Sequence, residues 1–176
     1  VNAAGMGLIL DFVPNHFSEG SPLIVRRPEV FLPGTEDLLA RDPDTFFRPP
    51  LAPDLILAHG RDPNFPAWTD TAQVNYFSSA ARSFMLAMLL EIAARCDGVR
   101  CDMAMLTLNE IFERTWSATP AVKDASRPEV EFWEEAISEV KRRHPGFLFI
   151  AEAYWNTERR LQDLGFDYVY DKPLYE

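Results

Sequence analysis

The sequence has few basic residues, few cysteines and no long apolar run, and each shortage excludes a class of function. Its 17 lysine and arginine residues against 27 acidic residues give a formal net charge of −10. That balance argues against nucleic acid or an anionic membrane surface as a partner. No apolar run approaches the roughly 18 residues of a membrane span. The two cysteines, Cys96 and Cys101, are too few for a disulfide framework and are expected to be inert core thiols.

The start of the chain bears on whether the sequence is a complete protein. It begins at Val1 instead of a methionine, and no secretory signal peptide is visible. We therefore expect a fragment of a longer protein. This leaves the compartment unknown, with a cytoplasmic location favoured.

Three short apolar runs each end in polar or acidic groups. They are GLILDFVPNH at 7–16, GVRCD at 98–102 and FLFIAE at 147–152. Near-continuous apolar runs are typical of strands in a parallel sheet. Acids at the C-terminal ends of such strands, with helical stretches between them, indicate the active-site rim of a β/α barrel.

The run at 98–102 places Arg100 two residues before Asp102. In a strand this spacing puts both side chains on one face. A guanidinium beside a carboxylate favours the ionised acid, which a carboxylate nucleophile requires. Asp102 is therefore a catalytic candidate. The alternative is a purely structural ion pair, which is the commoner meaning of such a pair in isolation.

The remaining segments predict helices, one further strand and a long irregular excursion. Helical spacing and capping residues predict helices from Ser78 or Ser79 to about Arg95, from Thr107 to about Trp116, from the capping box at 126–129 to before His144, and from Thr157 to about Leu164. Alternation predicts a strand at 166–170. Residues 17–77 show no sustained period and hold most of the prolines. Because long loops within a compact domain are usually functional, we expect this segment to overhang an active site.

Three motifs in the chain resemble the signature regions of one enzyme family, in the right order. DFVPNH at 11–16, GVRCD at 98–102 and AEAYW at 151–155 resemble the first, second and third signatures of the α-amylase family, glycoside hydrolase family 13. The resemblance covers nearly the whole chain. It implies an α/β fold that is a fragment of a (β/α)₈ TIM barrel, with about strands 3 to 5 and the start of strand 6.

The same resemblance implies a domain organisation. Residues 1–176 would form a partial catalytic barrel, since a complete one needs about 250 residues. Residues 17–77 would be a long loop or small inserted domain over the active site, after the first strand seen here. The parent chain would supply the remainder of the barrel.

The activity implied by the resemblance is retaining hydrolysis of α-glucosidic bonds in α-glucans or oligosaccharides, without an organic cofactor. Such hydrolysis needs two carboxyl groups about 5 to 5.5 Å apart. Asp102 would be the nucleophile and Glu152 the general acid and base. Glu152 shares its strand face with Leu148 and Ile150, so we expect an apolar setting that keeps its proton available, whereas Arg100 should keep Asp102 ionised.

The resemblance also assigns supporting residues. His16, Arg100, Tyr154 and Trp155 would contact substrate, the last two because aromatic rings stack on sugars. Asp11 and Asn15 would be structural residues at the site. Asn15 matches a position that ligates calcium in some members, but no second or third oxygen ligand can be chosen from the sequence, and calcium needs six to eight.

Two departures from the family pattern leave alternatives open. Met103 and Ala104 follow Asp102 where classical α-amylases have a Lys-His pair, so α-amylase specificity does not follow. The fourth signature, with its third catalytic aspartate, is missing, and the fragment is expected to be inactive alone. A transglycosidase of the same family is one alternative. A non-catalytic truncated barrel or weak sugar-binding product is the other.

Overall fold

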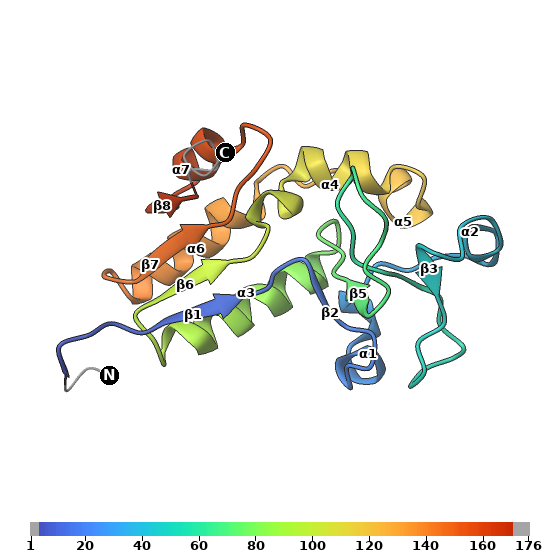
Figure 1. Ribbon diagram of the computed structural model, residues 1–176, viewed down its shortest axis with the longest axis horizontal. Helices are drawn as coiled ribbons and strands as arrows, with labels where there is room; N and C mark the ends of the chain where they lie inside the picture. Colours follow the sequence, from blue (N-terminus) through green and yellow to red (C-terminus); the bar gives the residue numbers. More distant parts are fainter. Residues whose placement is uncertain (1–3, 171–176) are drawn as a thin grey trace. The chain divides into compact units, whose positions relative to one another are not determined.

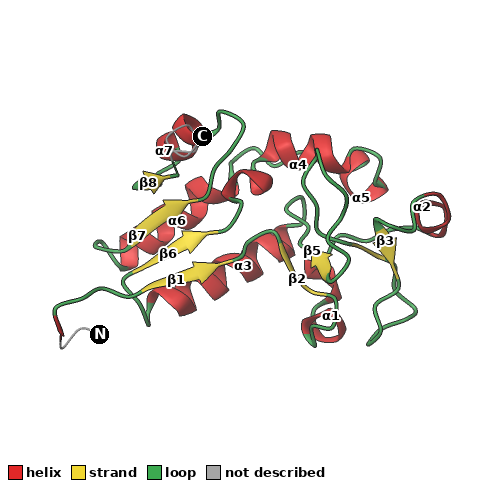
Figure 2. Cartoon of the chain, viewed as in Figure 1, coloured by secondary structure: helices red, strands yellow, loops and turns green. Residues whose placement is uncertain are grey.

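The computed structural model describes residues 4–170 and divides them into two compact units. The first unit comprises the described residues up to 14, then 85–108 and those from 129 onward. The second unit comprises 15–84 and 109–128. Figure 1 follows the chain through both, and Figure 2 shows their secondary structure.

The first unit is built on a four-stranded parallel sheet. Its strands are β1 (Ile9–Phe12), β6 (Gly98–Cys101), β7 (Leu148–Ala151) and β8 (Tyr168–Val169), side by side in that order. Chain order and spatial order therefore agree, as they do in consecutive strands of a β/α barrel. The register aligns Asp11, Arg100, Ile150 and Tyr168 in one row across the sheet.

In the part of the chain that the structure describes, helices cover one face of this sheet only. The helical elements of the first unit are α3 (Ser79–Ala93, from Met85 on), η3 (Ala104–Thr107), α6 (Phe132–Arg143) and α7 (Glu158–Asp163). Figure 1 shows α3 and α6 running along the same side of the sheet. Val99 and Phe149 are fully buried, whereas Leu148 and Tyr168 of the opposite alternation are 38% and 59% exposed. The second face of a sheet that is usually covered on both sides is thus open to solvent.

The second unit contains short elements. They are β2 (His16–Ser18), α1 (Leu23–Arg26), η2 (Pro28–Val30), α2 (Glu36–Arg41), β3 (Phe46–Phe47), β4 (Leu57–Ala58), β5 (Thr71–Gln73), α4 (Asn109–Trp116) and α5 (Pro120–Lys123). β2 pairs antiparallel with β5, and β3 with β4. The unit nevertheless has a core of its own, because Ile24, Phe31 and Tyr76 are at most 1% exposed.

The expected α/β class is confirmed, as a parallel sheet accompanied by small antiparallel sheets. The strands expected near 98–102, 147–152 and 166–170 are present, and the first apolar run forms β1. No helix within residues 4–170 has the length and apolarity needed to cross a bilayer. That 17–77 acts as an inserted domain over an active site stays a prediction.

The capping box expected at 126–129 is wrong as a helix start. Helix α6 begins at Phe132, with Glu131 at the N-cap and no side-chain capping bond. The carbonyl of Pro128 instead accepts a hydrogen bond from the Asn109 side-chain amide at 3.0 Å. That contact holds the segment against α4, so a capping pattern in sequence was overridden by tertiary structure.

Gly98 provides a test of how closely the strands are packed. A Cβ atom there would lie 2.7 Å from the Leu148 carbonyl oxygen and 2.7 Å from Ile9 Cδ1. Gly98→Ala should therefore lower the free energy of unfolding by about 1–3 kcal/mol through overpacking. Gly146→Ala is the matched control, since a Cβ at Gly146 meets nothing within 4 Å. Urea denaturation of both variants would measure this, and equal midpoints would contradict the close packing.

Candidate active site

The C-terminal ends of β1, β6 and β7 hold a cluster of charged side chains. Backbone hydrogen bonds continue the sheet ladder past the strand ends, because Asp102 N donates to the Phe12 carbonyl at 2.9 Å and Glu152 N donates to the Cys101 carbonyl at 3.0 Å. Tyr170 N extends the pattern by donating to the Ala151 carbonyl at 3.0 Å. The first residue after each strand is therefore fixed beside the end of the preceding strand.

Arg100 connects the members of this cluster. Its Nη1 donates to Asp11 Oδ1 at 3.0 Å and to Asp102 Oδ1 at 2.6 Å. Its Nη2 donates to Glu152 Oε2 at 2.8 Å, and its Nε donates to the Tyr170 hydroxyl at 3.0 Å. One rigid guanidinium fork thus orients three carboxylates and a phenol, for which arginine geometry is well suited.

Glu152 lies in a polar pocket of donors, so the expected apolar setting is wrong. Its Oε2 accepts from Arg100 and from the backbone N–H of Met103 at 2.9 Å, and its Oε1 accepts from the Tyr154 hydroxyl at 2.7 Å. The side chain is 12% exposed. Leu148 and Ile150 precede it on the strand, but the turn after β6 brings a backbone donor that strand alternation alone does not reveal.

The backbone around the two acids adopts uncommon conformations. Met103, directly after Asp102, has φ 44°, and Trp155 and Asn156, shortly after Glu152, have φ 62° and 60°. They are the described non-glycine residues with positive φ. Such conformations cost free energy and cluster at active sites and ligand clamps. At Met103 the conformation accompanies the backbone N–H bond to Glu152.

Burial raises the pKa of Asp102, which corrects the expectation that Arg100 would hold it low. The nearby Glu152 carboxylate also raises the pKa of Asp102, while the hydrogen bond and charge of Arg100 lower it without compensating for burial. The side chain of Asp102 is 27% exposed. The sequence indicated Arg100 as the partner of Asp102, but it did not indicate that Asp102 is partly buried.

The pKa values of two hydrogen-bond partners of these carboxylates are also raised. Hydrogen bonding to Glu152 and burial raise the pKa of Tyr154 to about 12, so its phenol is a stable donor. The pKa of Arg100 is raised by its bonds to Tyr170, Asp102 and Asp11, which outweigh burial. Arg100 therefore stays charged.

Five of the sequence-derived site residues belong to this cluster. Asp102, Glu152, Arg100, Asp11 and Tyr154 are joined by the hydrogen bonds above. Trp155 directly follows Tyr154 in the sequence and is 37% exposed.

Asn15 and His16 belong to the second unit. The His16 ring lies 5.3 Å from that of Trp68, centroid to centroid. Their roles at a catalytic site stay predictions.

The surroundings of Asn15 do not fit a calcium ion. The side chain is 1% exposed, and its Oδ1 accepts a hydrogen bond from Gln73 Nε2 at 3.0 Å. Calcium needs six to eight oxygen ligands. Residues 4–170 contain no group of three or more His, Cys, Asp or Glu side chains that could hold a metal.

Sequence reasoning missed two members of the cluster. Tyr170 accepts from Arg100 Nε, and the Arg100 guanidinium carbon also lies 5.6 Å from the centre of its ring. The alternation of Tyr168 and Tyr170 at the end of a predicted strand was the available signal. The backbone N–H of Met103 had none, since a methionine with φ 44° is not readable from the sequence.

Comparison with known proteins identifies the fold. No family model and no curated protein sequence matches the chain. Among solved structures, an α-amylase from Lactobacillus plantarum matches with 24% identity and a TM-score of 0.56, over 99% of this chain and 31% of that one. An α-amylase from H. orenii matches with 16% identity and a TM-score of 0.64, over 98% and 34%. A Nostoc punctiforme debranching enzyme, soaked with acarbose, matches with 18% identity and a TM-score of 0.55, over 97% and 31%.

These matches run through nearly the whole chain but cover about a third of each enzyme. The chain has the fold of a partial catalytic domain of the α-amylase family. At such identities the likeness defines the fold, while the chemistry has to be argued from the chain's own residues.

Asp102→Asn should stabilise the protein at neutral pH. Since the folded-state pKa of Asp102 is raised, the native state holds the extra proton between the unfolded value of about 3.9 and the folded value. The free energy of unfolding therefore falls as pH rises through that window. Asparagine does not ionise, so the free energy of unfolding of the variant does not fall in this way. Its urea midpoint should therefore exceed that of the wild type at pH 7 and approach it at pH 3.

Asp11→Asn is the control for this experiment. It removes a carboxylate from the same guanidinium, but one whose side chain is 60% exposed, and it should not raise the midpoint. A lower midpoint for Asp102→Asn than for the wild type at pH 7 would contradict the assignment of burial as the dominant effect.

Arg100→Met should lower the free energy of unfolding by about 2 kcal/mol, because it leaves partly buried carboxylates without their shared donor. Arg95→Met is the control. The Arg95 side chain is 67% exposed in an i,i+4 pair with Glu91, for which we expect a change within about 0.5 kcal/mol. Chemical denaturation at pH 7 compares the two. Similar losses would mean that Arg100 does not organise the cluster.

Proposed function

We propose that the chain is part of the (β/α)₈ barrel of a retaining enzyme that acts on α-glucosidic bonds. It would hold about strands 3 to 5 and the start of strand 6. The observation that carries the proposal is the pair of carboxyl groups, Asp102 and Glu152, held on one guanidinium at the ends of adjacent parallel strands. Retaining glycosidases use two carboxyl groups flanking the scissile bond, and barrel enzymes place them at this edge.

In the first step of the proposed mechanism, a carboxylate oxygen of Asp102 attacks the anomeric carbon of the sugar. Arg100 already engages Oδ1, so Oδ2 is the oxygen that we assign to the attack. The bond from the anomeric carbon to the glycosidic oxygen breaks, and Glu152 gives its proton to that oxygen. The products of the step are a glycosyl ester on Asp102, an ionised Glu152 and a shortened sugar with a free hydroxyl.

In the second step, water attacks the anomeric carbon from the face that the leaving group vacated. Glu152 takes a proton from the water, and the ester bond to Asp102 breaks. Both acids return to their starting states, and the sugar keeps its anomeric configuration. The Glu152 oxygens differ in their partners, since Oε2 accepts two hydrogen bonds and Oε1 one. We assign the proton transfer to Oε1.

The remaining assignments follow the same proposal. Arg100, Tyr154 and Trp155 would contact or orient the bound sugar, and His16 would bind it at the cleavage point. Asp11 and Asn15 would be structural. The substrate class is an α-glucan or oligosaccharide, a proposal supported by the acarbose soaked into the Nostoc enzyme. Residues 17–77 would cover the site, and the rest of the barrel would complete it.

Two alternatives have support of their own. The same residues would serve a transglycosidase if a sugar hydroxyl replaced water in the second step. A non-catalytic product is favoured by the open sheet face, where Ile9, Leu148 and Tyr168 are 39%, 38% and 59% exposed. Unpaired strand edges and exposed apolar faces promote association.

The test measures reducing ends released from maltooligosaccharides and starch. It compares the 176-residue chain with a longer chain that includes the flanking coding sequence, each also as Asp102→Asn and Glu152→Gln. We expect activity only in the longer wild type, with losses of at least about 10³-fold in both variants. Asp97→Asn, which changes an acid at the opposite end of β6, is the control and should stay active.

Asp102→Asn is predicted to be more stable than the wild type at pH 7, so a loss of its activity would not come from a folding defect. Circular dichroism of each variant would verify that it folds. Activity that survives Asp102→Asn in either chain would overturn the nucleophile assignment. Longer oligosaccharides formed in place of reducing ends would establish the transglycosidase. An inactive longer wild type that still folds would establish the non-catalytic alternative.

A further inference from the structure

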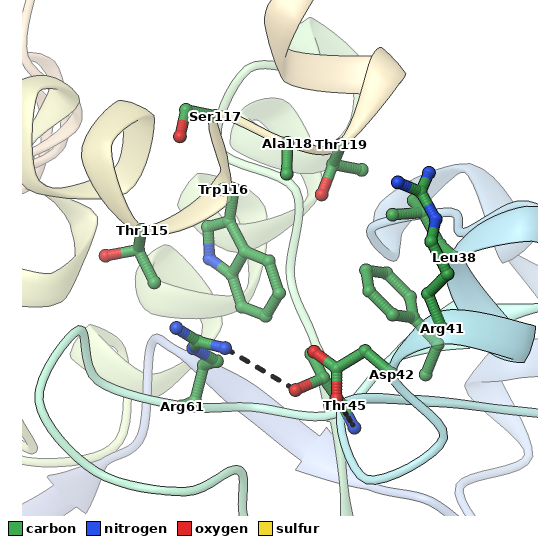
Figure 3. Close-up of a pocket in the computed structure, with 11 residues that line it drawn as sticks. Leu38, Arg41, Asp42, Thr45, Arg61, Thr115, Trp116, Ser117, Ala118 and Thr119 are labelled. Atoms are coloured by element: carbon green, nitrogen blue, oxygen red, sulfur yellow. Dashed lines mark hydrogen bonds between the residues drawn. The ribbon is translucent and has the colours of Figure 1, made fainter.

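The second unit contains a small cavity that the proposed catalysis does not use. Its volume is about 230 Å³, and all of its lining residues come from 38–61 and 115–119 of that unit. Figure 3 shows these residues. The apolar part of the wall is formed by Leu38, Phe46, Trp116 and Ala118. The rest of the wall carries hydroxyl, guanidinium and carboxylate groups, among them those of Thr45, Arg61 and Asp42.

Arg61 contributes a positive charge to this cavity and is not in an ion pair within the described residues. Its Nη1 makes a hydrogen bond of 3.4 Å to Thr45 Oγ1, which is long for an N–H donor. Its guanidinium carbon lies 5.7 Å from the centre of the Trp116 ring. Its Nε is buried and has no hydrogen-bond partner. Among residues 4–170 no ion pair is formed by Arg61.

Arg41 and Asp42 are the other charged groups of the cavity wall, and Asp42 keeps the negative charge of its carboxylate. The Nη2 of Arg41 pairs with Asp37. Asp42 Oδ1 accepts a hydrogen bond from the backbone N–H of Thr45 at 3.2 Å. Arg61 is thus the uncommitted cation. The buried Nε–H of Arg61 is unpaired, and leaving a buried donor unpaired costs free energy that an anionic acceptor would restore.

We propose that this cavity binds the phosphate group of a small phosphorylated molecule. The guanidinium fork matches phosphate oxygens in bidentate geometry. The hydroxyl of Thr45, which accepts from Arg61, can donate its own hydrogen to another oxygen of the same group. Phosphate uses such a set of donors more fully than a carboxylate, which has two oxygens.

The size and polarity of the cavity set the rest of the ligand. At about 230 Å³ it falls below the roughly 300–1,000 Å³ of sites for drug-sized ligands, so the organic part is small. The apolar wall gives that part a surface to contact. The net charge of −10 disfavours general anion binding, so phosphate retained by this chain would be retained locally.

Isothermal titration calorimetry with inorganic phosphate tests the proposal, at constant ionic strength set with sodium chloride. We expect a dissociation constant on the order of 1 mM for the wild type. Arg61→Gln should weaken binding at least about tenfold. Arg41→Gln is the matched control, because it removes an arginine from the same cavity wall, and it should change affinity less than about threefold. Titration with glucose 6-phosphate, glucose and acetate distinguishes a phosphate ester from a neutral sugar and a carboxylate.

Phenylglyoxal labelling of the wild type tests the location without a variant. Phosphate should slow modification of Arg61, read by mass spectrometry of its peptide, and leave that of Arg41 unchanged. Unaltered phosphate binding in Arg61→Gln, binding of glucose as tight as that of the ester, or absence of phosphate protection at Arg61 would each overturn the proposal. None of these results depends on glycosidase activity, so this inference and the proposed function fail separately.

Discussion

The guanidinium of Arg100 is the group on which the arrangement of the first unit's charged cluster depends. Asp11 lies in β1, and Asp102 and Glu152 directly follow β6 and β7. All three carboxylates accept hydrogen bonds from this guanidinium. Without a shared cation, negative charges at adjacent strand ends would repel one another. The register that aligns Asp11 with Arg100 therefore sets the electrostatics of the site as well as the packing of the sheet.

This arrangement separates the two principal acids by their surroundings. Asp102 has one oxygen on Arg100 and a pKa raised by burial. Glu152 accepts from a guanidinium, a backbone N–H and a phenol. The two acids thus have different partners, but burial favours the protonated form of Asp102, whereas the proposed nucleophile has to be ionised. Tyr154, whose pKa is raised to about 12, remains a donor throughout the ordinary pH range.

Much of this site could be predicted from the sequence because strands have a simple period. Apolar runs ending in acids located β1, β6 and β7, and the two-residue spacing placed Arg100 and Asp102 on one face. The same period predicted the wrong surroundings for Glu152, because two of its hydrogen-bond donors, Met103 N and the Tyr154 hydroxyl, lie beyond the strands. The predicted start of α6 was wrong for a related reason. Asn109 donates a hydrogen bond to the Pro128 carbonyl, and a local capping pattern does not indicate a contact between residues 19 positions apart.

Arg61 shows the same limit in the second unit. Asp62 directly follows Arg61 in the sequence and is the carboxylate nearest to it along the chain. The structure instead commits Asp62 Oδ1 to the backbone N–H groups of Asn64 and Phe65, at 2.6 Å and 3.1 Å. The turn thus uses the adjacent negative charge for its own backbone, and the guanidinium is directed to Thr45 and Trp116. Because the neighbouring carboxylate is hydrogen-bonded within the turn, the guanidinium can bind another anion. An irregular segment can therefore carry a binding site that its composition does not indicate.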